Sequence, residues 1–191
     1  MEKEQKITEE GYGMFSRDEM RLIKGIFKDN PLLIKTIRKF FFQGEMSEEE
    51  KKLLGMLKSL GGLPILRKCL LPEIDPESPL FQFADVYNGI STKDRSTEFV
   101  NTEIEAKMLL GKYLDNQFDV LENGKANEIK LRDLVDFGKH TNPTERHIFL
   151  ACRNALLMHI DTMMQMIKTL ADIKEETADE RSTRLKKDSA K

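Results

Sequence analysis

The sequence contains no tryptophan and only two cysteines, Cys69 and Cys152. These cysteines form no CxxC pair and lack the density of a secreted disulfide scaffold, so we interpret both as reduced thiols in a cytoplasmic protein. No GxxxxGK[ST] or GxGxxG motif is present, which excludes the two common glycine-rich cradles for phosphate groups. The longest apolar runs, such as Ile148–Cys152, fall far short of the roughly 20 residues of a membrane-spanning helix.

A surplus of one charge sign is also missing, because 31 basic side chains face 33 acidic ones and the formal net charge is −2. A wholly basic nucleic-acid-binding protein needs an excess of cations, so this class is not favoured. The first ten residues are charged and have no apolar stretch like that of a secretory signal peptide. We expect no membrane partner, and a location in the cytoplasm or in a particle assembled there.

Residue types that bind metals or perform catalysis are present but form no known motif. The three histidines supply neither HExxH nor ExxH, so zinc-protease and di-iron sites are not predicted. His147, Cys152 and His159 follow one another at spacings that do not give a common helix face. Three carboxylates do share a face, and without a histidine nearby we interpret them as solvated: Asp115, Asp119 and Glu122. We therefore predict no catalytic residue, no metal and no cofactor.

Capping signals divide the first part of the chain into helices. Asn30 before Pro31 indicates a helix start, since asparagine caps helices and proline suits the first helical position. Two capping boxes, in which each side chain satisfies the other residue's free amide, are Ser16 with Glu19 and Ser47 with Glu50. The predicted helices run to about Phe27, Gln43 and Leu60, and a short one starts at Pro64.

The middle of the chain is divided by prolines. Pro72, Pro76 and Pro79 exclude a regular helix over residues 72–79, and we interpret this segment as a joint between two helical layers. A short helix is predicted around residues 81–87, and a long one from about residue 97 to residue 123. The expected core stripe of the long helix is Val100, Ile104, Met108, Gly111, Leu114, Phe118 and Leu121. Residues 127–137 fit either a short helix or an extended piece that leads into one.

The longest predicted helix begins at Asn142 and Pro143, and no glycine or proline interrupts the chain after that point. Two apolar stripes beside a narrow polar line are typical of a helix surrounded by others. The stripes are Phe149, Cys152, Leu156, Ile160, Met163, Ile167 and Leu170, and Leu150, Leu157, Met164 and Ala171. The sequence thus predicts an all-α multi-helix bundle with a long C-terminal helix and charged terminal extensions.

The charge is distributed unevenly over five predicted parts. These are a charged extension (1–15), a basic helical layer (16–71), the proline-rich joint (72–79), a helical bundle with an acidic middle (80–173) and a second charged extension (174–191). Residues 16–71 carry +5 and residues 72–123 carry −7. Such polarity favours head-to-tail association of copies or docking on a charged partner. Chance variation over solvated faces is the alternative.

Three consecutive phenylalanines are the first candidate contact site. Such side chains project around about 200° of a helix, so one face does not easily bury all three. Either this helix is buried on two sides, or one ring is an exposed anchor for another chain. With the neighbouring cations, the candidate partner interface is Phe40, Phe41, Phe42, Lys35, Arg38 and Lys39.

The charged ends of the chain are the second candidate. Residues 2–10 and 175–191 have almost no apolar side chains and are expected to be mobile in an isolated monomer. Cations in the last segment either bind a partner or only oppose a helix dipole. The candidate tail contacts are Arg181, Arg184, Lys186 and Lys187.

No family motif is matched. We predict a non-enzymatic assembly or adaptor protein whose partners are proteins, either further copies of itself or other subunits of a larger complex. Small helical bundles with extended ends resemble, at the level of fold only, the connector and accessory proteins of phage particles. The alternative is a helical nucleic-acid-binding regulator that uses the basic layer or the C-terminal tail.

Overall fold

The computed structural model describes residues 6–71, 97–132 and 143–189. These ranges contain α1 (Arg17–Phe27), α2 (Pro31–Phe41), α3 (Glu48–Ser59), α4 (Leu63–Leu70), α6 (Thr97–Asn123), α8 (Pro143–Asp172), α9 (Ala178–Asp188) and the two-residue strands β1 (Lys6–Ile7) and β2 (Lys174–Glu175). The predicted all-α fold class is confirmed. The predicted joint at 72–79 and the short helix at 81–87 lie outside the described residues.

The capping predictions are confirmed atom by atom. The Glu19 amide donates to the Ser16 hydroxyl, and the Ser16 amide donates to the Glu19 carboxylate. The same reciprocal pair starts α3 after Ser47, and the Asn30 side chain accepts from the amide of Leu33 at the start of α2. These local hydrogen bonds satisfy amides that a helix start otherwise leaves unpaired, and they place the helix starts of the first layer.

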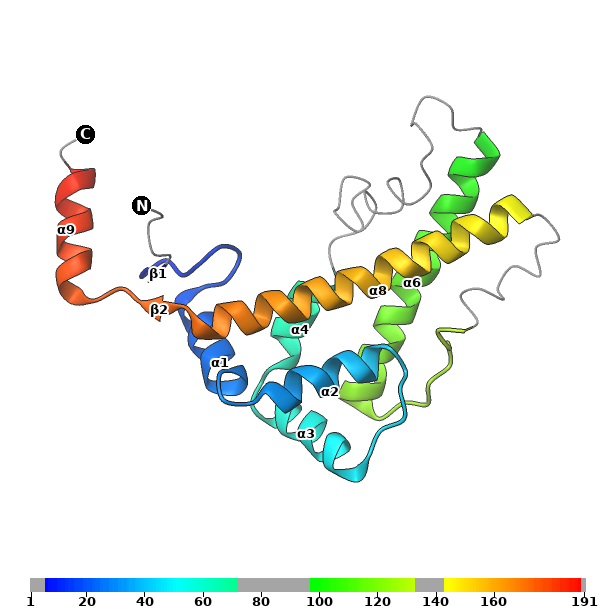
Figure 1. Cartoon of the computed structure of the whole chain (residues 1–191), viewed down its shortest axis with the longest axis horizontal. Coiled ribbons are helices and arrows are strands. Elements are labelled where there is room, and N and C mark those ends of the chain that lie inside the picture. Colours follow the sequence, from blue (N-terminus) through cyan, green and yellow to red (C-terminus); the bar gives the residue numbers. More distant parts are fainter. Residues whose placement is uncertain (1–5, 72–96, 133–142, 190–191) are drawn as a thin grey trace.

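The helix α8 is the axis of the molecule (Figure 1). In that view α1, α2 and α4 lie along its C-terminal half, and α6 crosses its N-terminal half. Where α6 crosses the N-terminal half of α8, both helices carry small buried residues, which let two helix backbones approach closely. These residues are Ala106 on α6 and Ala151 and Ala155 on α8. The helices on both sides of residues 72–79 contribute to one hydrophobic core.

The predicted core stripe of α6 is wrong in its first half. Leu114 and Phe118 are buried as expected, but Ile104 is 50% exposed and Met108 is 53% exposed. The buried face consists instead of Thr102, Ala106, Leu110, Tyr113, Leu114, Gln117 and Phe118. The helix carries two apolar stripes, and the buried one, which combines Ala106 with the large rings of Tyr113 and Phe118, packs into the common hydrophobic core.

The sequence predicts that α8 is surrounded by other helices, and the structure confirms this only for its C-terminal half. Met164 and Ala171 of its second stripe are buried, whereas Leu150 is 37% exposed and Leu157 is only partly covered. The N-terminal half is thus not enclosed on every side. This asymmetry follows from the positions of α1 and α2, which pack along the other half of the helix (Figure 1).

The long helix α8 does not continue into the charged extension. It ends at Asp172, and a new capping box, Thr177 with Glu180, starts α9. Between them β2 pairs in parallel with β1, with Lys6 opposite Lys174, and Ile7 is only 2% exposed. The two terminal segments, which the sequence predicts to be mobile, are therefore paired with each other through residues 6–7 and 174–175. The S/T-x-x-E signature at Thr177 is present in the sequence and indicates a helix start. The end of α8 at Asp172 was not predicted, because no glycine or proline marks it.

Candidate functional site

The phenylalanine run lies where α2 meets α6. Phe41 is completely buried, and its ring centroid is 5.3 Å from that of Phe118 and 5.4 Å from that of Phe40. Phe40 and Phe42 are partly buried against the same core. Burial on two sides is therefore the alternative that the structure shows. Phe41 is removed from the candidate interface, because it cannot reach a partner while the chain is folded.

A buried polar cluster holds the end of α2 in place. The Tyr113 hydroxyl donates to the carbonyl oxygen of Phe41, and Gln117 donates to the carbonyl oxygen of Phe40 and to the Tyr113 oxygen. Burial raises the pKa of Tyr113 well above its usual value, so this phenol stays protonated and remains a donor. The cluster fixes the position of α2 against α6 and leaves no reactive group at the surface.

Gln43 continues this connection just after the helix. Its φ of 54° is in the left-handed region, which turns the chain away from α2. Its side-chain nitrogen donates to the carbonyl oxygen of Ile129 over 3.0 Å, and its side-chain oxygen accepts from the amide of Leu131. Residues 124–132 form neither a helix nor a strand, so the short helix is not present up to residue 132, and residues 133–137 lie outside the described ranges.

The candidate cations beside the phenylalanines are mostly paired within the chain. Arg38 forms an ion pair with Asp161 of α8, which raises the Arg38 pKa, and its guanidinium lies 4.4 Å from the ring centroid of Phe42. Lys39 contacts Glu50 at 2.8 Å. The hydrogen bond from Lys39 lowers the pKa of Glu50, with help from the Ser47 amide. Lys35 is exposed, and no described residue forms an ion pair with it.

Of the four candidate cations in the C-terminal tail, the two arginines are paired within the chain and the two lysines are not paired with any described residue. Arg181 forms an ion pair with Glu9, and Arg184 contacts Glu176 at 3.0 Å. The hydrogen bond from Lys6 lowers the pKa of Glu180 to about 2. Lys186 and Lys187 remain exposed, with no ion-pair partner among the described residues. The candidate tail contact thus reduces to two lysines.

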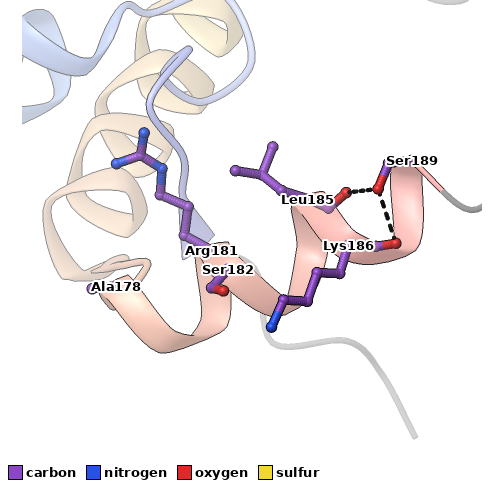
Figure 2. A pocket seen from close by; sticks show the side chains of 6 residues that line it. All are labelled: Ala178, Arg181, Ser182, Leu185, Lys186 and Ser189. Atoms are coloured by element: carbon purple, nitrogen blue, oxygen red, sulfur yellow. Dashed lines mark hydrogen bonds between the residues drawn. The ribbon is translucent and has the colours of Figure 1, made fainter.

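One face of α9 forms a shallow hollow. Figure 2 shows the residues that line it, and the Ser189 hydroxyl there donates to the carbonyl oxygens of Leu185 and Lys186 at 2.9 and 3.2 Å. The lining residues are Ala178, Arg181, Ser182, Leu185, Lys186 and Ser189. They lie on α9 or, for Ser189, at its C-cap, and no side chain of α9 is buried, so the hollow is a surface feature and is not enclosed by protein.

The three carboxylates of α6 are at least partly solvent-exposed, as predicted, but each also forms an ion pair within the chain. Arg67 of α4 contacts Glu122 at 2.8 Å and Asp115 at 3.8 Å, and Asp119 contacts Lys125 at 3.2 Å. The hydrogen bond from Arg67 lowers the pKa of Glu122. The Arg67 guanidinium also lies 4.7 Å from the ring centroid of Phe118. This cluster fastens α4 to α6 and is structural in character.

His147, Cys152 and His159 of α8 differ in their exposure to solvent. His147 is exposed, whereas Cys152 and His159 are buried. Burial lowers the pKa of His159, against hydrogen bonding to the backbone of Cys69 and Leu70, and raises the pKa of Cys69 to about 12. A thiol with so high a pKa is not a nucleophile at neutral pH. In the described ranges no three histidine, cysteine or acidic residues are grouped to hold a metal ion.

The feature that sequence reasoning missed is an exposed face on α6, called here the α6 outer face. Its six residues recur every three or four positions and occupy a sector about 100° wide on a helix of 3.6 residues per turn. They are Asn101, Ile104, Glu105, Met108, Lys112 and Asp115, and all are exposed. Figure 1 shows that the N-terminal end of α6 extends beyond α8. The signal available in the sequence was the presence of two apolar stripes on α6, more than one core needs.

Comparison of the chain with models of known families, with curated proteins and with solved structures gives no significant match. In the described ranges no helix combines the length and the apolar character needed to cross a bilayer.

Proposed function

We propose that the protein is a non-enzymatic assembly or adaptor protein that contacts other protein chains through the α6 outer face. The observation that carries this proposal is the exposure of Ile104 and Met108, 50% and 53%, at adjacent turns of one helix. Single exposed apolar residues are ordinary on protein surfaces, but large neighbouring ones often mark contact sites.

A partner that covers Ile104 and Met108 would stabilise the contact by burying apolar surface. Complete burial of an isoleucine or methionine side chain stabilises by about 1.5 to 3 kcal/mol relative to full exposure. Ile104 and Met108 are about half exposed, so a covering chain would gain roughly 1 kcal/mol from each. Glu105 and Lys112 border them and supply the polar rim found around such contact cores. The face is therefore suited to a reversible contact.

We also propose a cytoplasmic location. Cys69 and Cys152 are both buried, and neither forms a disulfide, as is usual for proteins kept in a reducing compartment. We propose further that the protein has no catalytic activity of its own. Burial raises the pKa values of Tyr113 and Cys69, so both groups stay protonated within the core and have no access to a substrate.

The nucleic-acid-binding alternative has weaker support. Four of the six cations in the candidate sites, Arg38, Lys39, Arg181 and Arg184, pair with carboxylates of the same chain and are less available to displace phosphate counterions. Such a regulator would bind with a log affinity that falls by about 0.9 per phosphate contact for each unit of log salt concentration. Filter binding from low to high salt, with no retention at any concentration, would remove this alternative.

Site-specific photo-cross-linking tests the proposed contact. A photoreactive amino acid replaces Met108 in the full chain, which is expressed in its native cells, and the matched variant carries it at the exposed Lys52 of α3. We expect a discrete cross-linked protein species from position 108 and none from position 52. A purely monomeric product from both positions would contradict the proposed function.

A further inference from the structure

We propose that the α6 outer face binds the same face of a second copy of this chain, with the two α6 helices antiparallel about a two-fold axis near Met108. This inference rests on the proposed function and names the partner. It starts from the order of residues along the face: Asn101, Ile104, Glu105, Met108, Lys112 and Asp115, all exposed.

The charges on this face are self-complementary in one orientation only. Glu105 lies three residues before Met108 and Lys112 four residues after it. When two such helices cross antiparallel at Met108, Glu105 of each copy lies opposite Lys112 of the other, and two ion pairs form. A parallel crossing would place Glu105 beside Glu105 and Lys112 beside Lys112, which is unfavourable. Antiparallel pairing is thus favoured by electrostatics.

These two charges are available for the contact. Among the described residues, none forms an ion pair with Glu105 or with Lys112, and both side chains are exposed. The other cations discussed above, by contrast, are mostly satisfied internally. A two-fold axis also needs no second surface, because an isologous contact uses the same residues on both subunits.

The apolar residues supply the centre of the contact. Met108 of each copy meets Met108 of the other at the axis, and Ile104 packs beside it against the aliphatic part of Lys112. The face from Asn101 to Asp115 is about 21 Å long at 1.5 Å per residue. This is small compared with stable protein interfaces. The partial burial of four apolar side chains, together with two surface ion pairs, corresponds to a weak, concentration-dependent dimer with a Kd of about 0.1 to 1 millimolar.

A charge-swap experiment with the full chain tests the pairing by sedimentation equilibrium at concentrations from about 0.05 to 1 millimolar, which bracket the expected Kd. The wild-type protein should be a reversible monomer–dimer mixture. Glu105→Lys and Lys112→Glu should each weaken dimerisation at least tenfold, because like charges then face each other. The double variant Glu105→Lys with Lys112→Glu should restore the wild-type Kd to within about threefold, since the ion pairs reform with reversed polarity. Circular dichroism verifies that each variant is folded.

Matched controls reverse the charges of the exposed Glu128 and Lys130, which lie outside the face, and should leave the Kd unchanged. A wild-type protein that stays monomeric, or a double variant that fails to recover, overturns the self-pairing. If such a monomer still cross-links to a different protein through position 108, the proposed function stands and only the inferred partner is wrong. If it does not, both are overturned.

Discussion

The hydroxyl of Tyr113 donates a hydrogen bond to the carbonyl oxygen of Phe41 over 2.5 Å, and both side chains are completely buried. Phe41 is the last residue of α2, and the final carbonyls of a helix have no partner within it. Tyr113 supplies that partner from α6, 72 residues further along the chain. The bond joins the basic helical layer to the rest of the bundle.

Replacing Tyr113 by phenylalanine should therefore destabilise the protein by about 1 to 3 kcal/mol, the cost of leaving a buried carbonyl unsatisfied. Gln117 also loses a hydrogen-bond acceptor in this variant. Urea denaturation followed by circular dichroism measures the change. A variant as stable as the wild type would show that the carbonyl finds another donor.

Two substitutions at Gln43 separate its side-chain bonds from its backbone conformation. Gln43→Ala and Gln43→Gly both remove the hydrogen bonds to Ile129 and Leu131, but only glycine adopts the left-handed φ without steric cost. We expect both variants to be less stable than the wild type, with the glycine variant more stable than the alanine variant by roughly 1 kcal/mol. Equal stabilities would mean that the backbone relaxes after substitution.

Acidification should destabilise the core through His159. Burial lowers its pKa in the folded state and outweighs the hydrogen bonding to the backbone of Cys69 and Leu70, which acts in the opposite direction. Folding thus favours the neutral ring, so the contribution of His159 is complete above the unfolded pKa of about 6.5 and is lost as the pH falls below it. One proton changes stability by at most about 1.4 kcal/mol per pH unit.

The measurement compares the wild type with His159→Gln, which cannot titrate, by urea denaturation at pH 7.5 and 5.5. The wild type should lose more stability than the variant over this interval. The thiol of Cys69, the neighbouring titratable group, has its pKa raised to about 12 by burial, so it stays neutral throughout. Equal losses in the two proteins would exclude His159 as the cause.

The helix α9 should depend on its capping box, because none of its side chains is buried. Hydrogen bonds from Lys6 and from the Thr177 amide lower the pKa of Glu180 to about 2. The stabilisation by this carboxylate is thus complete above its usual pKa and is lost as the pH falls toward 2. Glu180→Ala, which removes the side-chain acceptor of the capping box, should abolish this pH dependence and fray α9 already at pH 7.

Amide hydrogen exchange resolved by residue measures this fraying. Asp179→Asn is the matched control, because it removes a charge from the same helical turn but leaves the capping box intact. The control should exchange more slowly in α9 than the Glu180 variant. Identical exchange in both variants would mean that the charge near the helix dipole matters and the cap does not.

The sequence predicts the helix starts well, because a capping box is a local interaction between residues three positions apart. It does not predict which side of α6 is buried. Ile104 and Met108 look like core residues, but the neighbouring Ala106 faces inward because α6 crosses α8 at close range. Nor does it predict that Lys6 and Lys174 lie in paired strands, since pairing between chain ends depends on the complete fold.

The central claim, that a protein covers the α6 outer face, is tested most directly by methionine oxidation. Met14 and Met108 are almost equally exposed in one chain, at 51% and 53%, so peroxide should oxidise them at similar rates in the dilute monomer. At high protein concentration, or in the native complex, we predict that Met108 is oxidised several times more slowly than Met14. Equal rates under all these conditions would contradict the account.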